Sequence, residues 1–437
     1  MKTLLIVLGS LVLAAAALLV AGFYVLRAVL APLPGEWSVP LRMGPLQLPA
    51  GVPSLIRLAT SPWGGPLLSG REFDTAHGRL LLGWQGSQRT LLLRCTECIL
   101  QPPGLGQEAL RLSEVQASVR RQGEQLAGEV ASGRVRGQWQ GELVRGGLRL
   151  KLAIPATPLA DGYALFAAAM PEVAQARIGG QFSLQAQLSL PGGTLTVAPR
   201  IDGFEVSGLG TEALVGARTA CARGHRSSRL APESWLARAV VAAEDQRFYE
   251  HPGYDLAELT AALTGNQQAQ RTQRGASTLS QQLAKLLITG DERSAVRKLR
   301  ETLYAVEMER TLGKARILRL YLDNAPWGQQ LCGAESAARF YFGVRAGELT
   351  PAQASWLAAM LHNPGVEAQR WADTGQINLA RAQWVALALR GMSRAQKLAL
   401  AEDMALVEWP ATWAEPKTPA PAPKPRENPV TEKPVTL

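Results

Sequence analysis

The sequence predicts a multidomain α+β protein in which an antiparallel, β-rich domain precedes a mostly α-helical one. Its 437 residues are enough for two or three domains. Hydrophobicity alternates with a period of two within residues 33–210, and from about residue 232 the apolar residues recur with the period of a helix. With 47% hydrophobic and 19% charged residues, the chain can bury a sizeable core, which excludes general disorder.

A long apolar segment opens the chain. Residues 3–25 contain no charged side chain, and a helix of this length crosses about 30 Å of hydrocarbon. We therefore expect residues 1–28 to comprise a short cytoplasmic start and a transmembrane helix. A cleaved signal peptide is the alternative, although its apolar part usually has only about 7–15 residues. The positive charges of Lys2 and Arg27 flank the apolar segment on opposite sides and nearly balance, so they do not decide the orientation of the helix in the membrane.

The β-rich domain is expected over residues 33–210. Apolar side chains occupy every second position from 182 to 190, which predicts a half-buried strand, and a Pro-Gly-Gly turn at 191–193 follows it. Gly146 and Gly147 similarly separate two alternating segments. This domain is interpreted as a spacer or folding unit, with a docking surface as the alternative, because no catalytic constellation occurs in it.

Charge and cysteine content narrow the class of partner and compartment. The formal charge of +10 favours anionic partners, which include nucleic acid, acidic lipid and phosphorylated substrates. The four cysteines are too few for a disulfide scaffold and wrongly spread for a four-thiolate zinc site. They are compatible with one or two disulfides in an exported protein, and Cys95 and Cys98 are close enough for a local bridge.

The C-terminal part divides into a helical and a proline-rich segment. Helical periodicity extends to about Met404, and we expect residues 369–409 to form a helical extension. Residues 410–437 hold eight of the 28 prolines, which predicts a disordered, solvated tail of polyproline conformation.

The first segment with catalytic potential places Glu244 and Asp245 after an apolar helix face. Pro232 suits the first position of that helix, and Pro252-Gly253 is expected to end it. Burial raises the pKa of a carboxyl group toward the range that suits a general base. A capping or ion-paired cluster is the alternative.

The second segment is a helix expected to be opened by Ser277 as its N-cap. Thr278, Gln282 and Lys285 then lie on one polar stripe, which suits an oxyanion or phosphate. A solvated helix face is the alternative.

The third segment is a helix that begins near Ser294. Arg297 and Glu301 lie at i and i+4 on one face of it, where they form an ordinary ion pair or supply a guanidinium and a second carboxylate to a site for sugar and pyrophosphate.

Taken in order, these segments resemble the peptidoglycan glycosyltransferases, glycosyltransferase family 51, over residues 232–364. The motifs are E-D-x-x-F-x-x-H-x-G at 244–253, G-x-S-T-x-[ST]-Q-Q-x-x-K at 275–285 and R-K-x-x-E at 297–301, continued at 317–323 and 333–343. No Ser-x-x-Lys or Lys-Thr-Gly motif of a penicillin-binding transpeptidase occurs. The resemblance therefore implies a monofunctional enzyme with a lysozyme-like glycosyltransferase domain over residues 216–368.

The resemblance implies that lipid II is polymerised into a β-1,4-linked glycan strand. Glu244 would deprotonate the 4-hydroxyl of the acceptor, which attacks the anomeric carbon of the donor with inversion while undecaprenyl pyrophosphate leaves. Glu301 would assist as the second catalytic carboxylate. The implied substrate-binding residues are Asp245, Phe248, His251, Ser277, Thr278, Gln281, Gln282, Lys285, Arg297 and Lys298. No cofactor is implied with certainty, and a Mg²⁺ or Mn²⁺ ion bound with the pyrophosphate is an option.

The resemblance also implies a location and a set of partners. It places the protein in the bacterial inner membrane as a single-pass protein with its catalytic domain on the periplasmic side, in contact with lipid II and the nascent strand. Other cell-wall synthesis proteins are expected at the β-rich domain or the tail, and nucleic acid is not. The polar segment 264–274 is similar to the mobile loop over the family's cleft, with an ordinary surface loop as the alternative.

The sequence departs from the family pattern at three positions, and two alternative functions stay open. Ala276 replaces a common Gly, Arg319 a usual Glu and Asp323 a usual Asn. Arg319 either disturbs its helix or adds a surface charge. A catalytically silent envelope scaffold is the first alternative function, and a muramidase-type hydrolase with paired carboxylates is the second.

Overall fold

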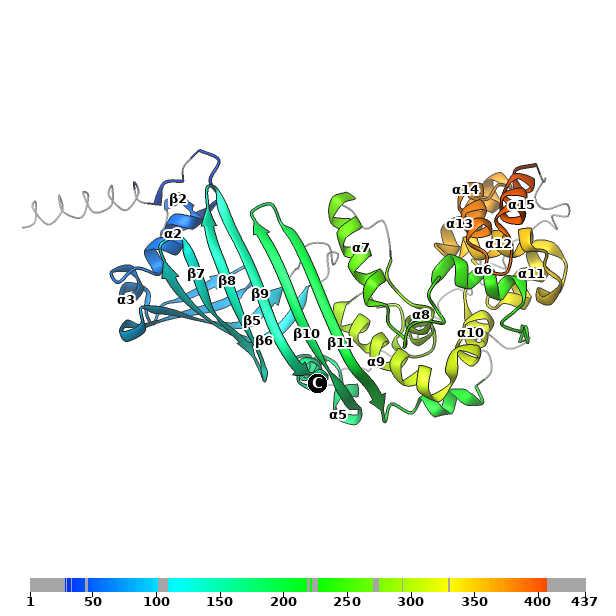
Figure 1. The fold of residues 1–437 in the computed structure, drawn as a ribbon, viewed down its shortest axis with the longest axis horizontal. Coiled ribbons are helices and arrows are strands. Elements are labelled where there is room, and N and C mark those ends of the chain that lie inside the picture. The colour runs from blue at the N-terminus through cyan, green and yellow to red at the C-terminus, as the bar shows by residue number, and fades with distance from the viewer. Residues whose placement is uncertain are drawn as a thin grey trace, which may run out of the picture.

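The structure is a computed structural model that describes residues 28, 30–32, 34–43, 46–100, 109–217, 221, 227–269, 275–292, 294–328 and 331–406. A large antiparallel sheet and a helical domain lie side by side (Figure 1), as the α+β prediction requires. The predicted anchor at 3–25 and the predicted tail at 410–437 lie outside the described residues. Among the described helices, none has both the length and the apolar character needed to cross a bilayer.

The sheet is a meander of nine strands in which each strand pairs with its neighbours in sequence, in the spatial order β11 to β3. Its strands are β3 (Glu72–Thr75), β4 (Gly78–Gln85), β5 (Thr90–Leu100), β6 (Leu110–Gln122), β7 (Gln125–Ser132), β8 (Val135–Val144), β9 (Gly147–Pro158), β10 (Arg177–Leu190) and β11 (Thr194–Ser207). Strands β1 (Ser38–Met43) and β2 (Leu46–Gly51) form a separate hairpin. Both predicted turns are confirmed, and Gly146 has the positive φ of +85° that favours glycine.

Register places the apolar residues of neighbouring strands on one face of the sheet. Ala186 of β10 pairs with Val197 of β11 and with Leu152 of β9, so the alternation predicted for residues 182–190 continues across strands. Near one end this face packs against Ile56 of helix α2 (Val52–Ala59). At the other end it packs against helix α4 (Leu159–Ala164), which belongs to the helical connection between β9 and β10.

The helical domain has one hydrophobic core to which nearly all its helices contribute. The helices are α6 (Trp235–Glu244), α7 (Leu256–Ala269), α8 (Leu279–Ala284), α9 (Ala295–Thr311), α10 (Gly313–Asn324), α11 (Ala334–Phe342), α12 (Pro351–Met360), α13 (Pro364–Thr374), α14 (Leu379–Ala388) and α15 (Arg394–Leu406). Trp356 of α12 is wholly buried at its centre. Trp371 and Met404 pack into the same core, so the segment 369–406 is continuous with the domain.

Three predicted details at the helix ends are wrong. Helix α6 begins at Trp235 after the N-cap Ser234, so Pro232 precedes the helix, and α6 ends at Glu244 rather than at Pro252-Gly253. The N-cap of α8 is Thr278, not Ser277. The Thr278 hydroxyl accepts a hydrogen bond from the Gln281 backbone amide, and the Gln281 side chain accepts one from the Thr278 backbone amide. This reciprocal capping box requires the glutamine three residues after the N-cap, a spacing that Thr278 has and Ser277 does not.

Two disulfides join the four cysteines in pairs. Cys95 and Cys98 are bridged within β5, and Cys221 is bridged to Cys332, which precedes α11. The second bridge ties the segment before α6 to the connection between α10 and α11. Both pairings agree with the expectation of one or two disulfides.

Two of the departures from the family pattern have a structural setting. The Asp323 carboxylate accepts from the Ser227 hydroxyl at 2.6 Å and from the backbone and hydroxyl of Ser228 at 2.9 Å, so it serves as an acceptor for the segment before α6. Arg319 is exposed on an intact α10 and therefore adds a surface charge.

Candidate functional site

Glu244 lies at the C-terminal end of α6 with its side chain 12% exposed. Its Oε2 accepts a hydrogen bond from Nε2 of Gln282 on α8 at 3.2 Å, and its Oε1 lies 3.5 Å from the Arg381 guanidinium of α14. Burial raises the pKa of the Glu244 carboxyl group, and the Gln282 bond and the charges of Arg381 and His362 oppose that rise without cancelling it. The position predicted to act as a base is therefore a partly desolvated carboxyl group with one neutral donor and one cation beside it.

Tyr321 fixes the orientation of the Gln282 side-chain amide. The Tyr321 hydroxyl donates to Oε1 of Gln282 at 2.9 Å, which leaves the Gln282 amide nitrogen facing Glu244. Burial raises the pKa of Tyr321 far above its ordinary value, so the phenol stays protonated and remains a donor. Gln282 is thus held as a donor to Glu244 by a buried residue of α10.

Asp245 and His251 form a buried pair that holds the start of α8. The backbone amide of Gly253 donates to Nδ1 of His251 at 3.2 Å, so Nε2 carries the ring proton and donates to the Asp245 carboxylate at 3.0 Å. The same carboxylate accepts from the backbone amide of Leu279, the first residue of α8, at 2.8 Å. The pair therefore joins the first motif to the second.

Gly253 is required where this segment crosses α9. Its φ of +98° lies in the left-handed region, and a Cβ added there would lie 2.9 Å from the backbone of Ala305. The Thr278 hydroxyl donates to the Gly253 carbonyl at 2.7 Å, which closes the contact between the two motifs. The glycine of the first motif thus allows the backbone of this segment to pass close to the backbone of α9.

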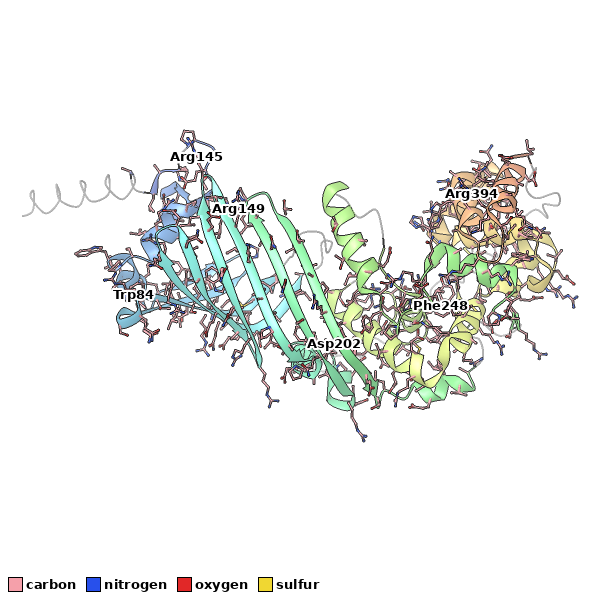
Figure 2. The ribbon with its side chains drawn as sticks, viewed as in Figure 1. Trp84, Arg145, Arg149, Asp202, Phe248 and Arg394 are labelled. Atoms are coloured by element: carbon pink, nitrogen blue, oxygen red, sulfur yellow. A yellow bond between two sulfur atoms is a disulfide. The ribbon has the colours of Figure 1, made fainter. Side chains whose placement is uncertain are left out.

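Several predicted substrate-binding residues lie in this supporting framework. Phe248 is fully buried inside the helical domain (Figure 2), with the Lys314 ammonium 4.5 Å from its ring centroid. Gln281 is also buried and donates to the Thr302 hydroxyl of α9 at 2.8 Å. These contacts favour a positioning role for Phe248 and Gln281, and likewise for Asp245, His251 and Thr278. Their predicted contact with substrate stays a prediction.

We expect the Asp245→Ala variant to be strongly destabilised. Removing the carboxylate leaves the His251 ring proton and the Leu279 amide buried without this acceptor, which costs about 2–4 kcal/mol. Thermal unfolding followed by circular dichroism checks the value. Asp74→Ala is the control, because Asp74 forms an exposed pair with Arg79 at 3.3 Å. An Asp245→Ala variant as stable as that control would contradict the bracing role.

Helix α9 presents the third motif next to the second. Arg297 and Lys298 both bind the Glu301 carboxylate, whose side chain is 2% exposed, and the Lys298–Glu301 distance is 2.8 Å. Lys298 also donates to the Ser277 hydroxyl, so α9 is joined to the segment that precedes α8. Within the described part of the chain, the Nε donor of Arg297 has no acceptor. The predicted pair of Arg297 and Glu301 is confirmed, and it is part of a larger cationic cluster.

Lys285 joins this cluster from the end of α8. Its ammonium lies 2.9 Å from the carboxylate of Asp291, which is almost fully exposed. The hydrogen bond from Lys285 lowers the pKa of Asp291, and the charge of Arg297 lowers it further, so the two cations act on one carboxylate. Gln282 lies in α8, and Lys285 begins the π-helical segment Lys285–Thr289 that directly continues it, so the donor to Glu244 and this cation are three residues apart. Acid and cations therefore belong to one connected group of residues.

Sequence reasoning missed Arg381, Tyr321 and His362. Arg381 lies beyond all the motifs, and neither its spacing nor its neighbours indicates a contact with Glu244. Tyr321 lies within the recognised segment 317–323, but a tyrosine on an apolar helix face is equally typical of a core residue. The charge of His362 lowers the pKa of Glu244.

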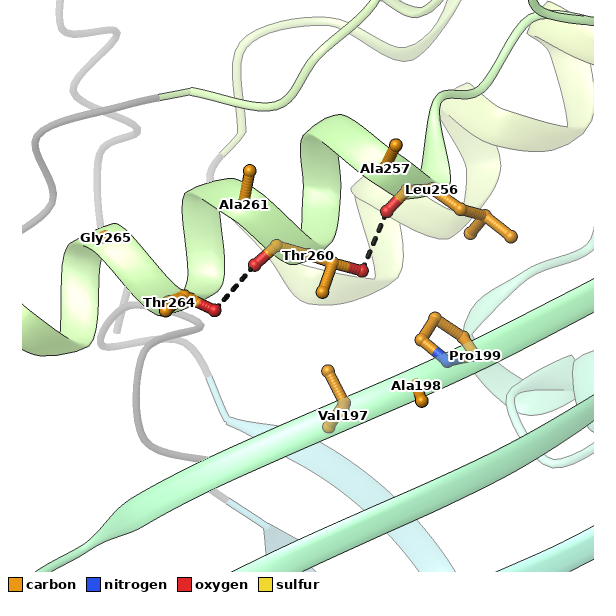
Figure 3. Close-up of a pocket in the computed structure, with 9 residues that line it drawn as sticks. All are labelled: Val197, Ala198, Pro199, Leu256, Ala257, Thr260, Ala261, Thr264 and Gly265. Carbon is orange, nitrogen blue, oxygen red and sulfur yellow. Dashed lines mark hydrogen bonds between the residues drawn. The ribbon is translucent and has the colours of Figure 1, made fainter.

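A groove of about 740 Å³ lies between α7 and the edge strand β11 (Figure 3). Apolar side chains line most of it, among them Val197, Pro199 and Leu256. The hydroxyls of Thr260 and Thr264 donate to carbonyls of their own helix, at 2.8 and 3.0 Å. The groove therefore suits an apolar group, and the acid and cations that could act on a glycosidic bond lie elsewhere.

Comparison with known proteins assigns the helical domain. Residues 223–389 match the family model described as Transglycosylase. Over 129 residues the chain is 45% identical to the biosynthetic peptidoglycan transglycosylase of Nitrosomonas eutropha and 50% identical to that of Aeromonas hydrophila. Over 132 residues it is 46% identical to that of Alcanivorax borkumensis.

The matches cover one part of each protein. Each aligned region is 30% of this chain, and the chain spans about half the length of these curated relatives, 53% of the first and 54% of the other two. The motifs at 244–253, 275–285 and 297–301 all lie within the matched residues. The family resemblance recognised from those motifs is confirmed over this part of the chain: residues 223–389 match the transglycosylase family.

Proposed function

We propose that the protein is an inverting peptidoglycan glycosyltransferase that polymerises lipid II into β-1,4-linked glycan strands and releases undecaprenyl pyrophosphate. The observation that carries the proposal is the connection of a buried carboxyl group of raised pKa, Glu244, with α8 through Gln282. Lys285 directly follows α8, and Lys298 of α9 binds Ser277 just before it. A lysozyme-like arrangement of the helices is part of the same proposal.

Glu244 is the general base in this proposal. Burial raises the pKa of the Glu244 carboxyl group, and a carboxylate of raised pKa accepts a proton from a sugar hydroxyl more readily than an exposed one. The acceptor 4-hydroxyl gives its proton to Glu244 as its oxygen attacks the anomeric carbon of the donor. Gln282 holds the carboxylate in place, and Arg381 favours its ionised form.

Lys285, Arg297 and Lys298 receive the charge that develops on the leaving pyrophosphate. Fixed cations stabilise such charge more strongly in the transition state than in the ground state. Glu301 keeps Arg297 and Lys298 together on α9. A divalent cation would arrive with the pyrophosphate, because the described residues contain no group of three or more metal-ligating side chains that would form a dedicated site. No step of the proposed mechanism depends on it.

The proposed location is the periplasmic face of the bacterial inner membrane. A polyprenyl substrate stays in the bilayer, so an enzyme tethered by a helix within residues 1–28 meets it at the surface. Two disulfides support an oxidising compartment outside the cytoplasm. Other cell-wall synthesis proteins are proposed to bind at the β-rich domain or the tail.

Incubation of the purified full-length protein with lipid II tests the function. Polymerisation into glycan strands supports the proposal. Hydrolysis of finished peptidoglycan without polymerisation would favour the muramidase alternative, and the absence of both activities would favour the scaffold.

We expect the Gln282→Ala variant to shift the pH dependence of polymerisation. The Gln282 hydrogen bond lowers the pKa of Glu244, so its loss raises that pKa further. A base must be deprotonated to act, and the acid limb of the kcat/KM profile therefore moves to higher pH. Profiles of the wild-type and variant proteins measured side by side check this shift. A lower rate with an unmoved acid limb would contradict the assigned role of the bond.

A further inference from the structure

Helix α9 has two faces that serve different parts of the molecule. Arg297, Lys298 and Glu301 lie on the face next to α8, where they form part of the cationic cluster. Leu303 and Val306 project to the other side, where they are buried against residues of the β-rich domain. One helix thus carries the proposed pyrophosphate site and the domain interface.

The interface contains a mixed hydrophobic core. Leu303 and Val306 of α9 pack with Leu159 and Tyr163 of α4 and with Phe204 of β11, and Val296 and Leu299 lie partly buried beside them. The Phe204 ring also lies 5.5 Å from the ring of Tyr254, which directly follows the first motif. The β-rich domain therefore contacts both the third motif helix and the end of the first motif.

A largely buried ion pair joins the same two domains. Glu172, at the start of α5 (Glu172–Gln175) in the connection between β9 and β10, accepts from Nε of Arg300 at 2.7 Å. The Glu172 side chain is 7% exposed and that of Arg300 is 27% exposed. Burial and the nearby Glu172 carboxylate also raise the pKa of Tyr304, one turn further along α9. Arg300 lies between Lys298 and Glu301 in sequence, so the pair fixes α9 at the level of the proposed site.

A second buried carboxylate fixes α9 about two turns beyond Arg300. Glu307 is fully buried and accepts from the backbone amides of Leu209 at 2.8 Å and Thr211 at 3.2 Å. Both residues follow β11 in the connection to the helical domain. The end of the sheet is thus hydrogen-bonded to the helix that carries Arg297 and Glu301.

We propose that the β-rich domain is a positioning element of the proposed transglycosylase site. Glu172 and Glu307 are positioning residues that fix helix α9 along and about its axis, so that Arg297 and Lys298 are correctly placed. The inference rests on the proposed function. It assigns the sheet a role in the reaction itself, in place of the spacer interpretation. The cost of a small shift of α9 is large, because a displacement of about 1 Å of a catalytic group lowers rates by up to about 10²-fold.

The test uses the full-length chain with Glu172→Gln, Arg300→Gln and the double substitution. Each single variant is expected to lower kcat for lipid II polymerisation about tenfold with a small change in KM, since α9 would be shifted without loss of a substrate contact. The double variant is expected to be no slower than either single variant, because the two residues act as one pair. Inorganic pyrophosphate is expected to inhibit all three variants more weakly than the wild-type protein.

Glu124→Gln is the matched control, because Glu124 forms a 2.8 Å pair with Arg57 inside the β-rich domain, away from α9. It should leave kcat and pyrophosphate inhibition unchanged. A second readout is amide hydrogen exchange of residues 295–311, which should be faster in Glu172→Gln and unchanged in Glu124→Gln. Wild-type kcat and exchange in Glu172→Gln would overturn the inference and leave the proposed function intact. A wild-type protein that does not polymerise lipid II would overturn the function, and the exchange data would still decide whether the pair holds α9.

Discussion

The Glu244→Gln variant is expected to lose lipid II polymerisation by about 10²- to 10⁴-fold, the usual contribution of a positioned general base. Glutamine has nearly the same shape and can still accept from Gln282, so the site keeps its outline while the proton acceptor is lost. The loss should appear in kcat more than in KM, since the substrate contacts remain. Single-turnover measurement of strand elongation with lipid II gives the rate directly.

The same variant should be at least as stable as the wild-type protein. Because burial raises the pKa of Glu244 above its unfolded value, ionisation of this carboxyl group opposes folding. The cost is complete above the folded pKa, decreases as the pH falls below it, and is absent below the unfolded pKa. Glutamine carries no charge and removes the cost. The melting temperature of the variant should therefore equal or exceed that of the wild-type protein at pH 7 and approach it in acid.

Glu250→Gln is the control for both measurements. Glu250 lies in the same motif but is half exposed and pairs with Arg247 and Arg390 at the surface. We expect it to keep its activity. An active Glu244→Gln variant would remove Glu244 from the mechanism, and an inactive but unfolded one would show that the buried carboxylate has a structural role instead.

The sequence predicted the antiparallel domain and the strands next to residues 146–147 and 191–193 because their signals are local. The alternation at 182–190 and the turns at 146–147 and 191–193 depend only on neighbouring residues, and antiparallel strands joined by short turns pair in order. The helix ends were predicted less well. Ser277 and Thr278 are adjacent hydroxyl residues that both suit an N-cap, and the position of Gln281 decides between them.

The motifs indicated a group of candidate site residues, but they did not indicate the contacts that each residue makes. Motif spacing indicated Glu244, Lys285, Arg297 and Glu301 as a group. It could not indicate that Asp245 caps α8 through the Leu279 amide, because that contact depends on how two helices meet in space. Arg381 and Glu172 are further examples, since each reaches the site region from a segment more than a hundred residues away in sequence.

The cationic cluster provides a sharp contrast between two substitutions. Lys285→Ala should leave the melting temperature unchanged, because the partner of Lys285 is the nearly fully exposed Asp291 and exposed pairs contribute about 0–1 kcal/mol. Arg297→Ala should lower it, because the buried Glu301 carboxylate would keep only Lys298, and breaking a buried pair costs about 3–5 kcal/mol.

Activity should fall in both variants, by about 10²- to 10³-fold each, the usual cost of removing one donor to a developing oxyanion. Among the described residues the ammonium of Lys285 pairs with an exposed carboxylate, which releases it to a phosphate at little cost. Lys285 is therefore expected to contribute to catalysis without contributing to the fold. Asp291→Asn is the informative control: it frees Lys285 without removing it and should preserve polymerisation. If Lys285→Ala kept full activity and full sensitivity to inorganic pyrophosphate, the cluster would be a solvated helix face, and the leaving group would have to be stabilised elsewhere. If only Arg297→Ala lost activity, the loss of a cation would have to be distinguished from unfolding. The rate should then be measured well below the melting temperature of the variant. A variant that is merely unstable regains its turnover there, and a variant that lacks a catalytic cation does not.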